Sequence, residues 1–238
     1  MNTGSDTVPV SGRPPTCVII PAFEEAAAIG GVIRAVRAQG MDVIVVDDGS
    51  TDATAAEAEK ATARVLRHAV NRGKGAALET GFRLARAQGY TAVITMDADG
   101  QHAPEDIPSF LQAHARTGRP VILGNRMTQA SNMPWLRRWT NRFMSWLLGR
   151  LLGQDVPDTQ CGFRFYCCAI LPDQPLTAIR FAAESEILLD LARRKIPISS
   201  VPIRTIYAHE RSKINPVTDS LRFIGMLLRQ RWRRRSRP

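Results

Sequence analysis

The chain has 238 residues, 44% of them hydrophobic, and a formal net charge of +10 at pH 7. This length allows one large α/β domain, with or without an appendage, and a sizeable hydrophobic core. Residues 1–119 carry 12 Lys/Arg and 14 Asp/Glu, whereas residues 120–238 carry 20 and 8, so their net charges are −2 and +12. The first half therefore excludes a generic polyanion-binding surface, and the second half favours phosphates or an anionic membrane as partners.

Neither an export signal nor a membrane span is expected. The first 15 residues lack the apolar core of a signal peptide and predict a disordered leader. No run of 18 apolar residues occurs, so no transmembrane helix is predicted. The four cysteines, Cys17, Cys161, Cys167 and Cys168, show no C-x-x-C spacing, which argues against zinc and favours reduced thiols in a cytoplasmic protein.

Apolar strands alternate with amphipathic helices through the first half of the chain. We expect strands over 17–20, 43–46, 64–66, 92–96 and 121–123, and helices over about 25–39, 52–61, 75–88 and 104–117. This alternation predicts an α/β fold with a mostly parallel sheet covered by helices on both faces. Ligands of such sheets bind beyond the carboxyl ends of the strands. The polar clusters expected at those ends contain Ala22, Glu24, Asp47, Asp48, Asp97, Asp99, Asn125 and Arg126.

The second half is less regular. It predicts an amphipathic helix over 134–152, a polar loop at 158–164 leading to an apolar run, a helix near 184–194 and a strand over 198–203. Trp139, Phe143 and Trp146 lie on one stripe of the first of these helices. A single aromatic stripe favours core packing, whereas the flanking arginines favour a helix at a membrane interface. Both interpretations remain open from the sequence.

The strand expected at 92–96 runs into the sequence MDADGQH (96–102), which places two carboxylates at positions i and i+2. In extended backbone Asp97 and Asp99 would face the same side, where their like charges require a cation. Their hard oxygen ligands favour Mg²⁺ or Mn²⁺, with phosphate oxygens and water in the remaining positions. Gln101 and His102 could supply further ligand atoms. The alternative is a turn in which Asp99 or a neighbour begins the next helix.

Two further motifs follow strands or precede helices. Asp47-Asp48-Gly49-Ser50 favours capping, although a carboxylate there could also accept a hydrogen bond from a ribose hydroxyl or a base N–H. Residues 71–75 (NRGKG) are basic and glycine-rich at the start of a helix, a position that attracts anions. They lack the G-x-x-x-x-G-K-[ST] spacing of a P-loop, and no strand leads into G-x-G-x-x-G. The second absence argues against a dinucleotide cofactor.

Six motifs occur together in a fixed order: PAFEE (21–25), VVDDGSTD (45–52), NRGKGAAL (71–78), MDADGQH (96–102), GNRM (124–127) and DTQCGFR (158–164). This ordered set resembles the inverting glycosyltransferase family 2, which has the GT-A fold, over about residues 16–215. It is most similar to the branch of dolichyl- or polyprenyl-phosphate mannose and glucose synthases. The resemblance implies a nucleotide-sugar donor of the GDP-mannose or UDP-glucose type, a divalent metal and a polyprenyl-phosphate acceptor.

The resemblance also implies the donor-binding residues. Those lining the nucleoside pocket would be Pro21, Ala22, Glu24, Val45 and Asp47. Those holding the diphosphate and metal would be Asp97, Ala98 and Asp99, with Gln101 as a third metal contact.

Basic residues of the second half would complete the donor site. Arg126 matches an arginine that contacts phosphate or sugar, and Lys213 and Arg211 match basic residues that close over the donor. The resemblance leaves open which of Tyr207, His209 and Arg211 is the partner of Lys213. Phe163 and Arg164 belong to the G-F-R signature of the family, and Arg164 could equally be a structural ion-pair partner.

The expected mechanism follows from charge. The metal and Lys213 would stabilise the departing nucleoside diphosphate while the acceptor attacks the anomeric carbon from the opposite face. A polyprenyl phosphate is already ionised at pH 7, whereas a hydroxyl acceptor needs a carboxylate as base. The only late candidates near motifs are Asp158, Glu184 and Glu186. Capping of a helix start is the favoured explanation for the two glutamates.

The expected organisation is a leader at 1–15, a catalytic domain at 16–215 and a basic amphipathic segment at 216–238. We expect a cytoplasmic enzyme held peripherally at the inner face of the cell membrane. One alternative is transfer to a sugar hydroxyl in cell-envelope polysaccharide or glycolipid synthesis. Another is a basic nucleic-acid-binding protein, which the lack of any recognised nucleic-acid module disfavours. No nucleic-acid partner is therefore expected.

Overall fold

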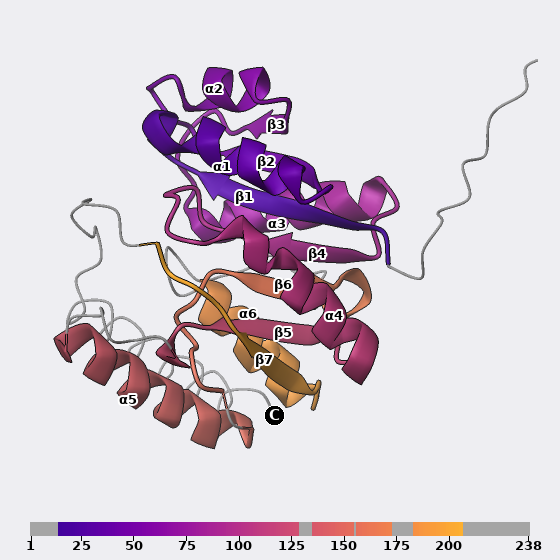
Figure 1. Ribbon diagram of the computed structural model, residues 1–238, viewed down its shortest axis with the longest axis vertical. Coiled ribbons are helices and arrows are strands. Elements are labelled where there is room, and N and C mark those ends of the chain that lie inside the picture. The colour runs from indigo at the N-terminus through magenta and orange to yellow at the C-terminus, as the bar shows by residue number, and fades with distance from the viewer. Residues whose placement is uncertain (1–13, 129–134, 155, 173–182, 207–238) are drawn as a thin grey trace, which may run out of the picture.

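A seven-stranded sheet forms the centre of the molecule, with the strand order β3-β2-β1-β4-β6-β5-β7 (Figure 1). The computed structural model describes residues 14–128, 135–154, 156–172 and 183–206. The strands are β1 (Thr16–Ala22), β2 (Asp42–Asp47), β3 (Arg64–Arg67), β4 (Ala92–Thr95), β5 (Val121–Asn125), β6 (Arg164–Cys167) and β7 (Ile198–Pro202). The leader expected at 1–15 and the segment expected at 216–238 lie almost wholly outside the described residues.

The predicted mostly parallel sheet is confirmed, with one exception. β1 pairs in parallel with β2 and β4, and β5 pairs in parallel with β7. β6 runs antiparallel to both of its neighbours, β4 and β5. The sequence predicted only an apolar run at this place, because a four-residue segment that begins with an arginine is a weak strand signal.

Six helices cover the two faces of the described sheet: α1 (Ala26–Ala38), α2 (Thr54–Lys60), α3 (Lys74–Ala87), α4 (Ile107–Thr117), α5 (Trp135–Leu152) and α6 (Ala183–Arg193). Alternate residues of β1 point to opposite sides. Val18 joins a core cluster with residues of α1 and α4, and Ile19 joins a second cluster with residues of α3 and α6. In Figure 1, α1 and α4 lie in front of the sheet and α3 and α6 lie behind it.

The aromatic stripe of α5 faces away from the protein. Trp139, Phe143 and Trp146 are 64%, 40% and 56% exposed, so core packing is the wrong interpretation of this stripe. α5 instead buries Met144 and Leu148 in the second core cluster. Within the described ranges, no helix combines the length and apolar character needed to cross a bilayer.

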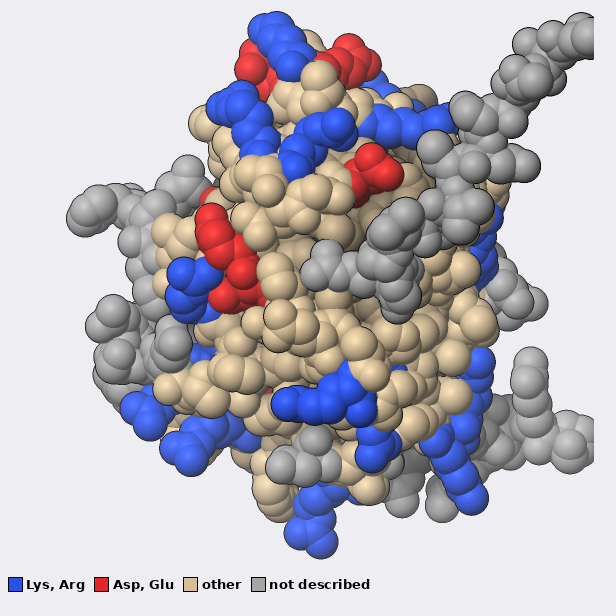
Figure 2. All heavy atoms as spheres, turned by 45° about the vertical axis from the view of Figure 1, so that its right-hand side comes forward, with Lys and Arg blue, Asp and Glu red and all other residues tan. Residues whose placement is uncertain are grey.

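The surface charge follows the division seen in the sequence. In the view of Figure 2, the visible Asp and Glu side chains lie mostly in the upper half, where the N-terminal elements are. Lys and Arg side chains dominate the lower half of this view, where the later elements are. The basic character of the second half is thus displayed on the surface.

Candidate active site

Asp97 and Asp99 lie just past the carboxyl end of β4, which ends at Thr95. Residues 98 and 99 form a turn, so the expectation that extended backbone aligns the two carboxylates is wrong. Gly100 has φ of +73°, which allows the chain to reverse. The backbone N–H of Gln101 donates to Asp99 Oδ1 at 3.0 Å, so this carboxylate also stabilises its own turn. Both aspartates nevertheless remain partly accessible at the edge of the sheet where the carboxyl ends of β1, β2, β4 and β5 lie, which we call the rim.

Lys74, the first residue of α3, connects Asp97 to the second half of the chain. Its Nζ lies 2.5 Å from Asp97 Oδ1 and 2.7 Å from Glu184 Oε1. Burial alone lowers the pKa of Lys74, but attraction to the two carboxylates outweighs it and raises that pKa above its ordinary value. Burial likewise raises the pKa of Asp97, but Lys74 and then His102 bring it well below the ordinary value. Lys74 is therefore charged and Asp97 ionised at neutral pH.

The position of Lys74 depends on the Asp47-Asp48-Gly49-Ser50 motif. Asp48 Oδ1 accepts the backbone N–H of Arg72 at 3.0 Å, and Asp48 Oδ2 accepts that of Gly73 at 2.7 Å. The Nδ1 atom of buried His68 lies 2.7 Å from Asp48 Oδ1. Asp48 thus anchors the NRGKG loop, and the loop presents Lys74 to Asp97. Both motifs were predicted from the sequence as separate signals, but their contact was not.

The loop before β6 passes directly against Asp97. Thr95 Oγ1 donates to the carbonyl of Gly162 at 2.8 Å. A Cβ atom on Gly162 would lie 2.7 Å from both carboxylate oxygens of Asp97, so this approach requires glycine. The DTQCGFR motif therefore forms one wall of the site.

His102 packs below Asp97 and contacts both its backbone and its carboxylate. Its ring is buried and stacks on Phe163 with 5.2 Å between centroids. Its Nδ1 accepts the backbone N–H of Asp97 at 3.3 Å, and its Nε2 lies 3.9 Å from Asp97 Oδ2. Burial lowers the pKa of His102, although Asp97 opposes that shift. This Nδ1 atom therefore stabilises the loop that carries Asp97 and is not free for a metal.

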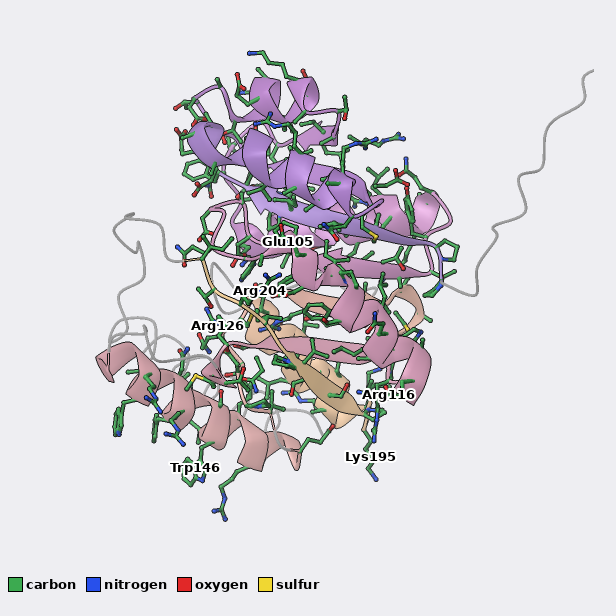
Figure 3. All side chains as sticks on the ribbon, viewed as in Figure 1. Glu105, Arg116, Arg126, Trp146, Lys195 and Arg204 are labelled. Carbon is green, nitrogen blue, oxygen red and sulfur yellow. The ribbon has the colours of Figure 1, made fainter. Side chains whose placement is uncertain are left out.

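Arg126 follows β5 and points towards the rim (Figure 3). Its Nε and Nη2 atoms donate to the two oxygens of Asp158 at 2.8 and 2.9 Å, and both residues are buried. Burial lowers the pKa of Arg126, but Asp158 more than compensates and raises it. Nη1 makes no hydrogen bond to the described residues. Asp158 is fully engaged by this fork and is not a free base.

Arg164 is fully buried and holds the loop before β6 to α6. Its guanidinium donates to the carbonyls of Cys161 at 2.6 Å, Thr159 at 2.7 Å and Glu184 at 2.9 Å. It also donates to the hydroxyl of Tyr166 at 3.2 Å. The alternative of a structural ion pair is therefore corrected to a structural clamp on backbone carbonyls, which positions both Gly162 and Glu184.

Glu184 and Glu186 lie in the first turn of α6. Glu184 is buried, and its carboxylate reaches Lys74, so the capping interpretation misses its main contact. Like Asp158, it is held in an ion pair. Glu186 is only half-buried.

The residues expected to line the nucleoside pocket lie at or near the ends of β1 and β2. Pro21, Ala22 and Asp47 are buried at these strand ends. Asp47 Oδ1 accepts the backbone N–H of Ser50 at 3.1 Å. Asp47 Oδ2 makes no hydrogen bond to the described residues, although Arg67 Nε lies 3.2 Å away. This oxygen is buried, and its closest charged neighbour among the described residues is the Arg67 guanidinium.

Glu24 and Val45 differ from the other expected pocket residues. Glu24 has φ of +56°, and its Oε1 accepts the backbone N–H and the hydroxyl of Thr51 at 2.7 and 2.9 Å. It ties the loops after β1 and β2 together. Val45 is fully buried in the core cluster beneath α1, and its expected place in the nucleoside pocket stays a prediction. Phe23, which the sequence reasoning missed, presents a half-exposed ring beside Ala22.

The rim fits a divalent cation that is shared with a ligand. Within the described residues, no group of three His, Cys, Asp or Glu side chains could hold a metal alone. Among the described residues, Asp97, Asp99 and Glu184 nevertheless outnumber the ammonium of Lys74, and the charge of Arg126 is balanced by Asp158, which leaves an excess of negative charge. Mg²⁺ and Mn²⁺ are commonly held by one or two carboxylates together with phosphate oxygens. Asp97 and Asp99 could supply such a pair, and the side chain of Gln101 is half-exposed next to them.

Several expected donor residues lie outside the described residues. These are Tyr207, His209, Arg211 and Lys213. The described chain ends beside the rim, because Ile206 donates its backbone N–H to the carbonyl of Gln101 at 2.9 Å. Thr205 also pairs with His102 in an isolated antiparallel bridge.

The chain is similar to known glycosyltransferases in sequence and in fold. The family profile described as "Glycosyl transferase family 2" matches residues 17–179. The UDP-N-acetylglucosamine–dolichyl-phosphate N-acetylglucosaminyltransferase of Methanococcus voltae is 32% identical over 80% of this chain and 85% of its own length. The polyprenol monophosphomannose synthase of Mycolicibacterium smegmatis is 30% identical over 74% of this chain and 70% of its own.

A solved structure shares the fold. The glucosyl-3-phosphoglycerate synthase of Mycobacterium tuberculosis in complex with Mg²⁺ and UDP is 25% identical. It matches with a TM-score of 0.62 over 88% of this chain and 74% of its own. The GT-A fold that the sequence implied is thereby confirmed.

Proposed function

Because the chain belongs to glycosyl transferase family 2, as its match over residues 17–179 shows, we propose that it transfers a sugar from a nucleotide-sugar donor to a polyprenyl phosphate. The similar enzymes of Methanococcus voltae and Mycolicibacterium smegmatis are named for dolichyl-phosphate and polyprenol substrates. The observation that carries the choice of acceptor is that the candidate base carboxylates are paired with cations. Asp158 and Glu184 are both held in ion pairs, which suits an acceptor that is already ionised.

The donor would lie across the carboxyl ends of β1, β2 and β4. Asp47 Oδ2 lacks a hydrogen bond to the described residues and would accept one from the nucleoside. Phe23 offers a half-exposed ring on which a base could stack. A GDP-mannose type of donor and a UDP-glucose type of donor would fit the Asp47 oxygen and the Phe23 ring equally well.

The diphosphate would meet the rim at Asp97, Ala98 and Asp99. Mg²⁺ or Mn²⁺ held by Asp97, Asp99 and Gln101 would supply Lewis-acid stabilisation of the leaving diphosphate. Lys74 keeps Asp97 ionised and fixed in position, while Gly162 leaves the space that its carboxylate occupies. The free Nη1 edge of Arg126 would donate to a phosphate or sugar oxygen. Lys213 and Arg211 are proposed to complete this positive environment.

The acceptor phosphate would attack the anomeric carbon from the face opposite the leaving diphosphate, which inverts the configuration there. The attacking oxygen carries its own negative charge, so no side chain needs to remove a proton. The role of the protein is then to align two anionic reactants and screen their repulsion. Lys74 and Arg126 are the described cations placed for this at the rim.

We further propose that the enzyme works peripherally at the cytoplasmic face of the membrane, where it would meet a lipid-linked acceptor. The net charge of +12 on residues 120–238 favours an anionic membrane surface. No nucleic-acid partner is proposed.

A donor and acceptor screen tests the proposed function. The purified chain would be incubated with radiolabelled UDP- or GDP-sugars, Mn²⁺ or Mg²⁺, and a short-chain polyprenyl phosphate in detergent. We expect label to pass into the organic phase on lipid extraction with one donor class. The Asp99→Asn variant serves as the matched inactive control. Label that moves only to a water-soluble sugar acceptor would contradict the proposal and favour a hydroxyl acceptor.

A further inference from the structure

α5 carries a ridge of aromatic side chains that no described part of the protein covers. Trp139 and Phe143 stack with 5.8 Å between centroids and only 5° between planes, and Phe143 lies 6.1 Å from Trp146. All three are exposed, and Trp146 projects from the side of α5 away from the sheet (Figure 3). A contiguous exposed aromatic ridge on a protein surface marks an interaction site more often than a single exposed ring does.

A basic groove of about 590 Å³ lies beside this ridge. Its described lining residues are Met127, Arg138, Arg142, Ser145, Trp146, Gly149, Arg150, Gly153, Gln154, Val156 and Pro157. None of them is acidic. Asp155, which lies between two of them in the sequence, is outside the described residues.

The arginines of the groove are available to an external ligand. Arg138, Arg142 and Arg150 are exposed, and none forms an ion pair with an acid in the described ranges. Arg150 instead packs its guanidinium 5.6 Å from the centre of the Trp146 ring. This contact joins the groove to the ridge, so cationic and aromatic groups form one continuous surface along α5. In Figure 2 the lower part of the molecule, which contains the later elements, likewise displays mainly Lys and Arg.

The two kinds of side chain point to the surface of a bilayer. Tryptophan and phenylalanine are stable at the level of lipid headgroups, and arginines bind the phosphates of anionic lipids. An amphipathic helix that lies flat on the membrane presents both along its length. A free phosphate ion would use the arginines but would leave the three rings without a function.

We propose that α5 is a docking surface for anionic bilayers, with Trp139, Phe143 and Trp146 in the interface and Arg138, Arg142 and Arg150 on lipid phosphates. The proposal rests on the proposed function, because it identifies the surface by which this enzyme would reach a lipid acceptor. The groove also borders Met127 and Pro157, the sequence neighbours of Arg126 and Asp158. Docking through α5 therefore places lipid phosphates next to the rim that holds the donor.

The first test measures binding of the full chain to vesicles by flotation. Vesicles of phosphatidylcholine with phosphatidylglycerol are compared with vesicles of phosphatidylcholine alone. The triple variant Arg138→Gln/Arg142→Gln/Arg150→Gln should lose binding to the anionic vesicles by at least ~10-fold, since each arginine near such a surface contributes roughly fivefold. The control Arg83→Gln/Arg116→Gln/Arg119→Gln removes the same charge from exposed positions on other elements and should change binding by less than about twofold.

The second test concerns the aromatic ridge. Trp139→Ala/Phe143→Ala/Trp146→Ala should weaken binding by ~10-fold or more, and it should reduce the quenching of tryptophan fluorescence by brominated lipids. Exposed positions make misfolding improbable as a cause, and an unchanged circular dichroism melting curve would verify this. Equal losses in the arginine triple and its control would overturn the proposal, as would failure of the unaltered chain to bind anionic vesicles.

Other ligands give distinct results. The bilayer assignment would be overturned if inorganic phosphate bound the α5 arginines as well as vesicles do. It would also be overturned if duplex DNA bound through the same arginines. The detergent assay separates this proposal from the proposed function. Transfer to a detergent-dispersed polyprenyl phosphate should survive in both α5 triple variants, whereas loss of that transfer in the unaltered chain would refute the function and not the docking surface.

Discussion

The rim at the carboxyl ends of the strands and the outer face of α5 are both rich in charge, but they hold it differently. At the rim, Lys74 contacts Asp97 and Glu184, and Arg126 is forked to Asp158. On α5, Arg138, Arg142 and Arg150 have no acidic partner among the described residues, and exposed rings lie beside them. The charges of the rim are thus neutralised by ion pairs within the protein, whereas the arginines of α5 are open to neutralisation by an external ligand.

This difference predicts how substitutions in each region behave. Removing the shared cation of the buried rim pairs leaves two carboxylates uncompensated, so loss of Lys74 should lower both stability and turnover. Exposed arginines contribute little to folding, so α5 variants should change only what the protein binds.

The largest effect is expected from removing a carboxylate that would hold the metal. Asp99→Asn should lower the turnover number at least ~100-fold, the scale of losing a main electrostatic stabiliser of the transition state. Chelation with EDTA should abolish turnover of the unaltered chain, and Mn²⁺ or Mg²⁺ should restore it. Sugar transfer in steady-state assays measures both, and full activity in excess EDTA would refute metal dependence.

Lys74→Met should have opposite effects on turnover and on the affinity for Mn²⁺. Turnover should fall on the order of 30-fold, because Asp97 loses the group that holds it and Glu184 loses its partner. Binding of Mn²⁺ to the nucleotide-free protein should become tighter, since a competing positive charge has left Asp97. Electron paramagnetic resonance of Mn²⁺ titrations measures this affinity independently of activity.

The matched control for this variant is Lys60→Met, which breaks an exposed pair with Glu57. It should change neither turnover nor Mn²⁺ affinity by more than about twofold. Weaker Mn²⁺ binding in Lys74→Met would show that Lys74 organises the metal site and does not compete with it.

Much of the rim could be predicted from the sequence, because strand ends are local signals. The positions of Asp97, Asp99 and Arg126 beyond buried strands follow from apolar runs that stop at polar residues. The contact between Lys74 and Glu184 could not be predicted, since these residues come from different halves of the chain. It depends on two intermediaries, Asp48 and Arg164, which hold the NRGKG loop and α6 in place.

β6 and α5 show two further limits of pattern reasoning. β6 begins with a buried charge, which argues against a strand until one sees that backbone carbonyls surround the guanidinium of Arg164. In α5 the aromatic stripe faces outward. The buried side includes Asn141 and Ser145, and the hydroxyl of Ser145 accepts the backbone N–H of Thr159. Hydrophobic periodicity identifies a helix, but it does not say which partner covers the apolar side.

The sequence of the C-terminal segment predicts a second membrane contact, which can be compared with the one proposed for α5. Residues 222–237 carry seven arginines and no acid, and apolar residues precede them. A chain that ends at Asp219 should bind anionic vesicles ~10-fold less tightly at low salt, and the binding that remains should depend on the arginines of α5. Flotation measures both effects. Equal binding by the two chains would leave α5 as the sufficient contact.

The smallest effect is expected at Glu184, where a substitution tests whether the carboxylate is only an ion-pair partner of Lys74 or also a catalytic base. Glu184→Gln keeps the shape of the side chain and a hydrogen-bond acceptor for Lys74, so transfer to a polyprenyl phosphate should fall by less than ~5-fold. A general base for a hydroxyl acceptor contributes about 10²- to 10⁴-fold, which makes the two possibilities easy to tell apart. Glu186→Gln, on the same first turn of α6, is the matched control and should retain activity within about twofold. Both variants should show unaltered circular dichroism spectra. A complete loss of transfer in Glu184→Gln alone, with the fold intact, would mean that this carboxylate removes a proton and that the natural acceptor is a hydroxyl group.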